Sequence, residues 1–408
     1  MPRTSRKREL DIDVLEAARN RIAWTFDRFD RIYVSGPSGK DSSVMLHLAA
    51  AEARRRGRKL GVLYIDLEAQ YKATIDHVRE MFALYADVIE PHWIALPIHL
   101  RNAVSMTKPY WMCWDPAECV RWVRQPEPGS ITDPSVFPFF RVGMEFEEFV
   151  EEFGDWYGGD EPAACLVGIR TDESLNRWRS IAKDRASRVD GKPWTARKGL
   201  QTCNVYPIYD WRTEDLWTFV AREGLPYNRI YDLMHAAGLT LHQMRICQPY
   251  GDDQRKGLDL FHVMEPETWA RVVARVEGAN AGALYCRESG NVLGNRKAEL
   301  PDGHTWESYA DLLLSSLPTH ERDHFEDKIA VFLKWYMKRG YPDGIPDAAD
   351  PKDEAARRVP SWRRIVKVIL KNDRVCKGLS FSQQGSRKEQ QEKYKDMMKR
   401  RRATWRVI

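Results

Sequence analysis

The most constraining feature of the sequence is an alternation of short apolar runs and longer helical patterns near the N-terminus. The runs 31–35, 61–66 and 89–96 have the length and composition of buried strands. Helical spacing of apolar residues fills the segments between them, at 41–57 and 70–86. Parallel strands need such crossover helices, whereas antiparallel strands can be joined by tight turns. The sequence therefore predicts an α/β fold with a parallel sheet flanked by helices.

The rest of the chain adds to this sheet. Residues 101–160 are rich in Trp and Pro and are predicted to be an insertion packed on the core. The other expected elements are a helix at 10–28, strands at 164–170 and 206–211, helices at 213–224 and 255–285, two amphipathic helices at 304–340 separated at Pro318, a linker at 342–359 and a basic amphipathic helix at 360–373. We expect an α/β domain at 1–240, a helical extension at 241–345 and a basic, mainly helical C-terminal segment at 346–408.

The composition is that of a soluble protein, 43% hydrophobic and 30% charged. No apolar run approaches the roughly 18 residues of a membrane span. The seven cysteines lack CxxC spacing, which argues against a zinc ribbon or a disulfide scaffold. The basic N-terminal stretch is not followed by the apolar segment of a signal peptide. We therefore expect a cytoplasmic protein that does not contact membranes.

The charge is unevenly distributed along the chain. The net charge is +5, but residues 355–408 carry 17 Lys and Arg against 4 Asp and Glu. This segment is either a solvated tail or a surface for a polyanion. Within it, residues 360–371 place Trp362 among four cations, a pattern that fits contact with a nucleic-acid backbone or with an acidic protein.

The turn at 35–43, SGPSGKDSS, is the strongest candidate for a binding site. It connects a predicted strand to a predicted helix, so unpaired backbone N–H groups and the positive end of the helix dipole point at one place. Lys40 adds a full charge, and Ser42 and Ser43 add hydroxyl donors. Asp41 suits either a Mg²⁺ ligand or a group that orients the lysine. The pattern is not a Walker A loop, because the first glycine of that motif is missing and Asp41 follows Lys40.

This turn resembles the SGGKDS loop of the ATP pyrophosphatase (PP-loop) superfamily, whose members cleave ATP between the α- and β-phosphates. Two positions depart from the pattern. Pro37 lacks an amide donor, and Ser38 replaces a glycine, at some cost if its φ is positive. The hydroxyls of Ser35 and Ser38 can replace lost donors. The resemblance implies a Rossmann-like fold and ATP bound by the loop, including Gly39. A helix start without a ligand and a loop that binds nucleotide without hydrolysis remain open.

Two carboxylates follow the second predicted strand. Asp66 and Glu68 lie at its end, in YIDLEAQY. In an open parallel sheet the ligand lies beyond the carboxyl ends of the strands. We expect these groups to bind Mg²⁺ or a ribose hydroxyl, with Asp41 and Asp66 as the metal ligands. Capping of the next helix is the alternative.

A third segment, GIRTDESLNRWRS at 168–180, follows the apolar run ACLV. Gly168 permits close backbone approach, and Arg170 and Arg177 suit recognition of phosphate, sulfate or carboxylate. The alternative is a surface ion pair between Arg170 and Glu173.

These segments resemble the phosphoadenosine phosphosulfate (PAPS) reductase branch of the superfamily, with its G-[IL]-R-x-x-E-S-x-x-R motif and a later stretch similar to YPIYDW…LPYNRIYD at 206–232. The resemblance extends over almost the whole chain to an IbrA-like subfamily with a DUF3440-type C-terminal region, on EAQY (68–71), PYWMCWDP (109–116), MRICQPYGDDQRKGL (244–258) and PSWRRIVKVILKNDRVCKGLSFSQ (360–383). Members are typically encoded beside a ParB/sulfiredoxin-like protein, which implies such a partner.

The chain lacks the cysteine segments that sulfonucleotide reductases use. The nucleophilic cysteine of a Glu-Cys-Gly-[IL]-His segment is missing, as are the paired cysteines of the iron–sulfur type. Cys376 and Cys247 are the substitutes available for such a reaction, and structural roles are the alternative for both.

Three functions therefore remain. The first is an enzyme that uses ATP and Mg²⁺, releasing AMP and pyrophosphate or adenylating an acceptor such as a nucleic acid. Lys40, Asp41, Arg170 and Arg177 would be its catalytic residues. The second is a nucleotide-binding regulatory module without turnover. The third is a residual sulfonucleotide reductase.

Overall fold

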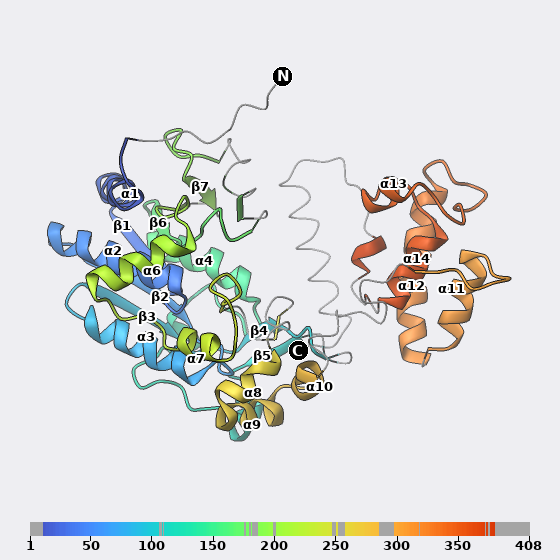
Figure 1. The fold of residues 1–408 in the computed structure, drawn as a ribbon, viewed down its shortest axis with the longest axis horizontal. Helices are drawn as coiled ribbons and strands as arrows, with labels where there is room; N and C mark the ends of the chain where they lie inside the picture. The colour runs from blue at the N-terminus through green and yellow to red at the C-terminus, as the bar shows by residue number, and fades with distance from the viewer. Residues whose placement is uncertain are drawn as a thin grey trace. The chain divides into compact units, whose positions relative to one another are not determined.

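The computed structural model describes residues 11–105, 108, 110–174, 177–178, 181, 187–198, 201–246, 250–251, 258–284, 298–317, 319–371, 373 and 376–379. The chain divides into two compact units, residues 1–284 and 285–408, which are described separately (Figure 1). The boundaries expected at 240 and 345 fall inside the first and the second unit.

Unit 1 is built on a six-stranded sheet with the strand order β3-β2-β1-β6-β8-β7. All neighbours are parallel except β7, which pairs antiparallel with β8 at the edge. The strands are β1 (Arg31–Ser35), β2 (Leu60–Ile65), β3 (Ile89–Ile94), β6 (Ala163–Leu166), β7 (Thr195–Lys198) and β8 (Thr202–Val205). The predicted parallel α/β sheet is thus confirmed, with one antiparallel edge strand added.

The order of the strands creates a switch point between β1 and β6. From β1 the chain proceeds outward to β2 and β3, and then returns to add β6 on the other side of β1. Tyr33 in β1 is accordingly in register with Gly61 on one side and with Cys165 on the other. The connections that leave β1 and β6 run in opposite directions along the sheet. Open α/β sheets bind ligands at such a crevice, beyond the carboxyl ends of the strands.

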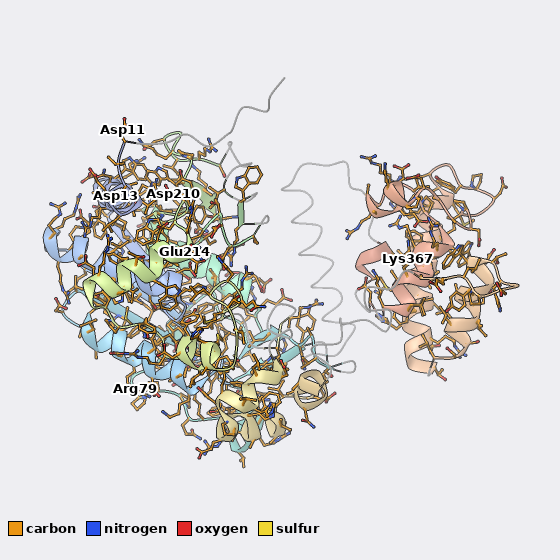
Figure 2. All side chains as sticks on the ribbon, in the orientation of Figure 1. Asp11, Asp13, Arg79, Asp210, Glu214 and Lys367 are labelled. Carbon is orange, nitrogen blue, oxygen red and sulfur yellow. The ribbon has the colours of Figure 1, made fainter. Side chains whose placement is uncertain are left out.

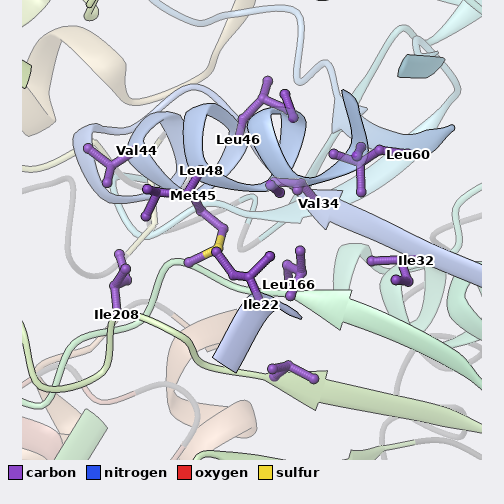
Figure 3. Close-up of a cluster of buried hydrophobic side chains, with 14 of the residues drawn as sticks. Ile22, Ile32, Val34, Val44, Met45, Leu46, Leu48, Leu60, Leu166 and Ile208 are labelled. Atoms are coloured by element: carbon purple, nitrogen blue, oxygen red, sulfur yellow. The ribbon is translucent and has the colours of Figure 1, made fainter. Parts of the chain in front are cut away.

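One face of the sheet is covered by α1 (Val14–Arg28), α2 (Lys40–Arg56), α3 (Lys72–Leu84) and α6 (Thr213–Glu223). Side chains from these helices and from alternate strand positions form one buried apolar cluster (Figure 3). Ile32 and Val34 of β1 point into it, which is the period-two pattern of a strand. The predicted helices at 10–28, 41–57 and 70–86 therefore exist, because their apolar stripes have a sheet to cover.

The opposite face is covered by α4 (Phe146–Gly158). The ring of Tyr33, between the two inward residues of β1, lies 5.3 Å from the rings of both Phe153 and Tyr157. Gly61 in β2 makes this packing possible, since a Cβ there would lie 2.6 Å from the Tyr157 hydroxyl oxygen.

The strand expected at 206–211 is wrong. This segment is a turn, and the strand β8 precedes it. Pro207 explains the difference, because a strand paired on both sides needs an N–H at every position and proline has none. Ile208 and Trp211 are buried from the turn, which accounts for the apolar pattern.

The insertion at 101–160 packs on unit 1, as expected. It contains the strand β5 (Tyr110–Cys113), paired antiparallel with β4 (Ile98–Arg101), two short 3-10 helices at Pro116–Arg121 and Pro134–Val136, and α4. Trp111 is 7% exposed and Trp114 2%. These rings are packing groups here, and neither presents a face to stack a base. Unit 1 also contains α7 (Ile230–Ala236), α8 (Phe261–Met264), α9 (Pro266–Arg275) and α10 (Ala279–Leu284).

Unit 2 is helical. It contains α11 (Trp306–Ser315), α12 (Thr319–Met337), α13 (Pro351–Ala355), α14 (Trp362–Leu370) and a 3-10 turn at Lys377–Leu379, around a core of its own. The two predicted helices on either side of Pro318 are present. The expected linker at 342–359 is wrong, because it includes α13 and the buried residue Glu354, which bonds to α14.

The basic helix α14 uses most of its cations inside unit 2. Arg363 and Lys367 form ion pairs with Glu354 at 3.1 and 3.0 Å (Lys367 is labelled in Figure 2). Arg364 is 4% exposed and donates to the carbonyls of Val359 and Gly378. These groups therefore stabilise the fold rather than offer a free basic face. The last part of the basic segment, residues 380–408, lies outside the described residues.

In the part of the chain that the structure describes, no helix is both long and apolar enough to cross a membrane.

Candidate functional site

The loop between β1 and α2 begins the site. Gly36 adopts the left-handed region at φ 66° and its N–H donates to the carbonyl of Leu63. Helix α2 starts at Lys40 with Gly39 as its N-cap, so the helix begins one residue before the expected start. The Ser42 hydroxyl lies 3.2 Å from the Gly39 nitrogen and satisfies that N–H. The tight turn that the sequence suggested is therefore formed.

The two unusual residues of the loop are accommodated without strain. Ser38 is not among the described residues with positive φ, because Gly36 supplies the left-handed turn. Pro37 has no N–H, but its carbonyl accepts from the Ser43 hydroxyl at 3.3 Å. Ser35 and Ser38 are half-buried, and within the described chain their hydroxyls have no hydrogen-bond partner. The two hydroxyls that were expected to compensate for Pro37 are therefore still available as donors.

Lys40 is buried and engaged with a distant part of unit 1. Its backbone N–H donates to the Tyr231 hydroxyl at 2.9 Å, and its ammonium donates to the Met244 carbonyl at 3.0 Å. The ammonium also lies 3.5 Å from the Asp41 carboxylate. The side chain is only 7% exposed. The main cation of the loop thus contacts the segment around α7 instead of solvent.

Arg170 joins the two sides of the switch point. It follows β6, is 1% exposed, and forms an ion pair with Asp41 in the first turn of α2. Its guanidinium also lies 3.3 Å from the Thr213 hydroxyl and 3.6 Å from Asp172. Gly168 allows this approach, because a Cβ there would lie 2.7 Å from the carbonyl carbon of Asp41. The structure therefore brings together Lys40, Asp41, Gly168 and Arg170.

Ser43 faces inward to a histidine that the sequence analysis did not single out. Its hydroxyl lies 2.7 Å from Nε2 of His77 in α3. Burial, and to a lesser degree the nearby His47, lowers the pKa of His77 to about 4, so the ring is neutral at pH 7. Its Nδ1 is buried and has no hydrogen-bond partner within the described chain. Ser43 is thus a structural contact of the loop in this conformation rather than an outward donor.

Asn228 holds the outer side of the loop. Its amide donates to the Ser38 carbonyl at 2.9 Å and to the Thr74 hydroxyl at 3.0 Å, and it is fully buried. Asn228 and Tyr231 lie in the stretch LPYNRIYD, so the available signal was that resemblance, which pointed to the stretch but not to these two side chains.

The ion pair described for Arg177 lies outside the group formed by Lys40, Asp41 and Arg170. The Arg177 side chain is 47% exposed, and it pairs with Glu173, four positions earlier in the sequence, at 3.6 Å. The expectation that Arg177 acts beside Lys40 and Arg170 rests on the sequence alone.

Asp66 is at the carboxyl end of β2, as expected, but it is fully buried and engaged. One carboxylate oxygen accepts from the indole of Trp93 at 2.8 Å. The other forms an ion pair with Arg124 and accepts from the Glu68 N–H at 3.0 Å. The geometry assigns Asp66 to holding the insertion on the sheet and does not favour the expected Mg²⁺ role.

Glu68 has a similar structural role. It is fully buried and accepts from the backbone N–H groups of Trp114 and Val123 at 2.7 and 3.2 Å. Its carboxylate also pairs with Arg275 of α9 at 2.9 Å. Burial raises the pKa of Glu68, and Arg275 opposes that rise. In this conformation Glu68 is a tether between β2, the insertion and α9, and the expected ribose contact is not favoured.

Comparison with known proteins assigns the chain to a family. Residues 147–236 match the phosphoadenosine phosphosulfate reductase domain, and residues 238–342 match a domain of unknown function, DUF3440. The chain is 45% identical over 402 residues to the uncharacterized protein YbdN of Escherichia coli (strain K12), covering 98% of this chain and 97% of that protein. The chain belongs to the YbdN family.

More distant relatives share only part of the chain. Phosphoadenosine 5'-phosphosulfate reductase of Xylella fastidiosa is 23% identical over 238 residues, which covers 57% of this chain and 81% of that enzyme. The solved PAPS reductase of Candida auris, a phosphate complex, aligns with a TM-score of 0.34 at 14% identity, over 59% of this chain and 90% of its own.

The residues of the candidate site fall before, within and after the match to the reductase domain. Gly168, Arg170 and Tyr231 lie inside the match to the PAPS reductase domain, whereas Lys40 precedes it. Met244 lies in the DUF3440 match. The site of this YbdN-family chain is therefore formed jointly by residues before, within and after the recognised reductase domain.

Several DUF3440 residues contact the sheet domain within unit 1. Glu265 accepts from the N–H groups of Lys72 and Ala73 at 2.7 and 2.9 Å, which satisfies the N-terminus of α3. The Tyr250 hydroxyl donates to the Ala69 carbonyl at 2.9 Å. Together with Arg275 and Met244, these contacts hold the first part of DUF3440 along the carboxyl edge of the sheet.

The described residues fit Mg²⁺ only weakly. No group of three or more His, Cys, Asp or Glu side chains with metal-binding geometry occurs among them. Of the two expected ligands, Asp66 is fully buried, whereas the Asp41 side chain is 14% exposed. Mg²⁺ is usually held by one or two carboxylates together with substrate phosphates. Asp41 is therefore the remaining protein candidate, with nucleotide phosphates as the other ligands.

Of the described cysteines, Cys113, Cys165, Cys203 and Cys376 are buried and only Cys119 is exposed. Cys376 is 7% exposed and lies in the core of unit 2, while Cys247 lies outside the described residues. Burial raises the pKa of Cys165 and of Cys203 to about 12, which keeps both as thiols.

Proposed function

We propose that this protein binds ATP at the 35–43 loop and cleaves it between the α- and β-phosphates, releasing AMP and pyrophosphate or transferring adenylate to an acceptor. The observation that carries the proposal is the meeting of Lys40, Asp41 and Arg170 at the switch point, from the loops after β1 and β6. This is the edge at which open α/β sheets bind their ligands.

The reaction would use these residues mainly for electrostatic stabilisation. An oxygen of water or of the acceptor attacks the α-phosphorus, with the proton of an attacking O–H passing to solvent, and the bond from that phosphorus to the bridging oxygen breaks. The electron pair leaves with pyrophosphate, whose growing negative charge Lys40 and the N-terminus of α2 would stabilise. The hydroxyls of Ser35 and Ser38 can donate to the same phosphates. Arg170 would keep Asp41 oriented toward the nucleotide, where Mg²⁺ bound by Asp41 would offset further phosphate charge.

The proposal also includes an acceptor and a protein partner. A nucleic acid is supported by the basic charge of residues 355–408, apart from Arg363, Arg364 and Lys367, which bond within unit 2. A ParB/sulfiredoxin-like partner is supported by the resemblance of the sequence to the IbrA-like subfamily.

A regulatory module that binds nucleotide without turnover is the second candidate. Pro37 removes one amide donor, and the N–H and ammonium of Lys40 are both engaged by protein groups. The third candidate, residual reduction of a sulfonucleotide, has support only in the family match at 147–236 and would have to use Cys247 or Cys376.

Calorimetry of the full chain with ATP and Mg²⁺, followed by chromatography of the same sample, tests the proposal. We expect binding and formation of AMP, both lost in Lys40→Ala. Lys72→Ala is the matched control, because Lys72 is 74% exposed at the start of α3 and its side chain pairs with Asp76. Binding without AMP supports the regulatory module. If neither ATP nor pyrophosphate binds, the proposal is wrong.

A further inference from the structure

Several donors of the candidate loop are already bonded within the protein itself. The Gly39 N–H bonds to Ser42, and the Ser43 hydroxyl bonds to the Pro37 carbonyl and contacts His77. The Lys40 N–H donates to the Tyr231 hydroxyl, and one of the three N–H donors of its ammonium bonds to the Met244 carbonyl. A phosphate at the N-terminus of α2 would take hydrogen bonds from the Lys40 N–H and ammonium. The conformation described here is therefore one in which the chain itself competes with an anion.

The competing groups belong to one continuous segment. Tyr231 lies in α7 and Met244 in the turn that follows, and Asn228 at the start of the segment bonds to the Ser38 carbonyl. Arg245 at its end donates to the Glu173 carbonyl, in the segment that follows β6. Residues 228–245 thus extend over both loops of the switch point and act as one covering element.

Two buried polar atoms beside this contact are left without partners. His77 contacts the Ser43 hydroxyl through Nε2, whereas Nδ1 of the same ring is unpaired within the described chain. His77 is 3% exposed. Trp217 Nε1 is also buried and unpartnered within the described chain, and its ring packs edge-on against Tyr231 at 5.5 Å. Leaving a buried polar atom unpaired costs free energy. These unpaired atoms raise the free energy of the covered conformation relative to one in which they reach water.

We propose that residues 228–245 form an intramolecular gate, in which the Tyr231 hydroxyl and the Met244 carbonyl occupy the Lys40 N–H and one donor of its ammonium until the phosphates of a nucleotide displace them. This gate rests on the proposed nucleotide site and deepens it. A ligand that displaces it must carry at least two anionic oxygens in reach of Lys40, one for the N–H and one for the ammonium. That requirement selects an oxyanion such as a phosphate group over a monatomic anion such as chloride.

The gate predicts that removing one competing group strengthens binding. Tyr231→Phe deletes the hydroxyl that accepts from the Lys40 N–H and keeps the ring against Trp217. Since a net hydrogen bond is worth about 1 kcal/mol, inorganic pyrophosphate and ATP should bind about three- to tenfold more tightly to this variant. Hydrogen exchange at the Lys40 amide should become faster in the variant without ligand, because that amide loses its acceptor.

Tyr227→Phe is the matched control. Tyr227 also packs edge-on against Trp217, at 5.3 Å, but its hydroxyl bonds to Asp232 and not to the loop. We expect its affinity for pyrophosphate to equal that of the unmodified chain.

Calorimetry with pyrophosphate on the full-length proteins separates the outcomes. Tighter binding by Tyr231→Phe, with Tyr227→Phe unchanged, supports the gate. Equal affinity in all three proteins overturns the gate and leaves the nucleotide site intact. Weaker binding by Tyr231→Phe also overturns it, because Tyr231 would then be a ligand of the phosphate. Failure of all three proteins to bind pyrophosphate or ATP overturns the gate together with the proposed function.

Discussion

The guanidinium of Arg170 and the carboxylate of Asp41 form an ion pair that joins the loop after β6 to the first turn of α2. The pair is shielded from water, since Arg170 is 1% exposed and the Asp41 side chain 14%. A charge removed from one side of such a pair leaves the other buried without compensation. The ion pair is therefore a structural element of the switch point as well as part of the candidate site.

Asp41→Asn should lower the free energy of unfolding of the chain by about 3 kcal/mol, because the Arg170 charge then loses its buried partner. Asp172→Asn is the control. Asp172 is 44% exposed and 3.6 Å from the same guanidinium, so its loss should cost less than about 1 kcal/mol. Urea unfolding of both variants measures the difference. Equal effects would show that Asp41 has no special role in balancing Arg170.

Gly168→Ala should destabilise the protein by about 1–3 kcal/mol or shift the start of α2, because the added Cβ would lie 2.7 Å from the Asp41 carbonyl carbon. Gly39→Ala offers a contrast within the same site. Its φ is −91°, and an added Cβ would meet no atom closer than 3.6 Å, so the substitution carries no steric cost. Because Gly39 is the N-cap of α2 and Ala is a poorer N-cap, we expect a loss of stability of less than about 1 kcal/mol. Thermal unfolding of the two variants distinguishes them, and a stable Gly168→Ala would contradict the close approach of the two loops.

Glu68→Gln should loosen the insertion and α9 from β2. The substitution removes the charge that pairs with Arg275 and leaves that guanidinium buried, so we expect a loss of about 3 kcal/mol in stability. Hydrogen exchange should increase at residues 110–125 and 266–275 more than in the sheet. Glu127→Gln is the control, since Glu127 lies in the same insertion but pairs with the half-exposed Arg79 (labelled in Figure 2). Uniform changes across unit 1 would argue against a local tether.

Glu354 should make unit 2 sensitive to acid. Burial alone would raise the pKa of Glu354, but hydrogen bonds from Ser361, Arg363 and Lys367 outweigh it and lower the pKa to about 2. A lowered pKa contributes stability that is complete above the unfolded pKa, 4.5, and is lost as the pH falls from there toward 2.

Replacing this carboxylate should therefore matter at neutral pH and much less in acid. Glu354→Gln should cost on the order of 2–3 kcal/mol at pH 6 and a smaller amount at pH 3, where the native carboxylate has already lost part of its advantage. Glu326→Gln, at a 53% exposed position on α12, is the control and should show little effect at either pH. If the loss of stability in Glu354→Gln does not change with pH, the lowered pKa of Glu354 is contradicted.

The fold could be predicted where its signals are local. Period-two and period-3.6 patterns located β1, β2, β3 and the helices around them to within a few residues, because each pattern reports burial against the sheet. The edge strand β7 was missed, since its sequence, TARK, has half its residues exposed and no apolar run. The strand at 206–211 was misplaced because burial in a turn produces the same apolar pattern as burial in a strand.

The site could be predicted only in part. Lys40, Asp41, Gly168 and Arg170 stand next to strand ends, and strand ends of a parallel sheet share one edge. The contact between Lys40 and Met244 uses a backbone carbonyl, which any residue type has, so no sequence signal exists for it. Asp66 and Glu68 were placed correctly at the end of β2, but their roles depended on partners that are distant in sequence. Arg124 is 58 positions from Asp66, and Arg275 is 207 positions from Glu68.

The first part of DUF3440 has a consequence for how members of this family can exchange parts. The family match begins at residue 238, but the compact unit continues to 284, and Met244, Glu265 and Arg275 bond to the sheet domain in between. A hybrid gene joined at residue 238 would take Glu68 and the start of α3 from one parent, and the side chains at 265 and 275 that bond to them from another. A hybrid joined at 284 would inherit each of these pairs intact, so recombination within the family should be tolerated at the second junction and selected against at the first.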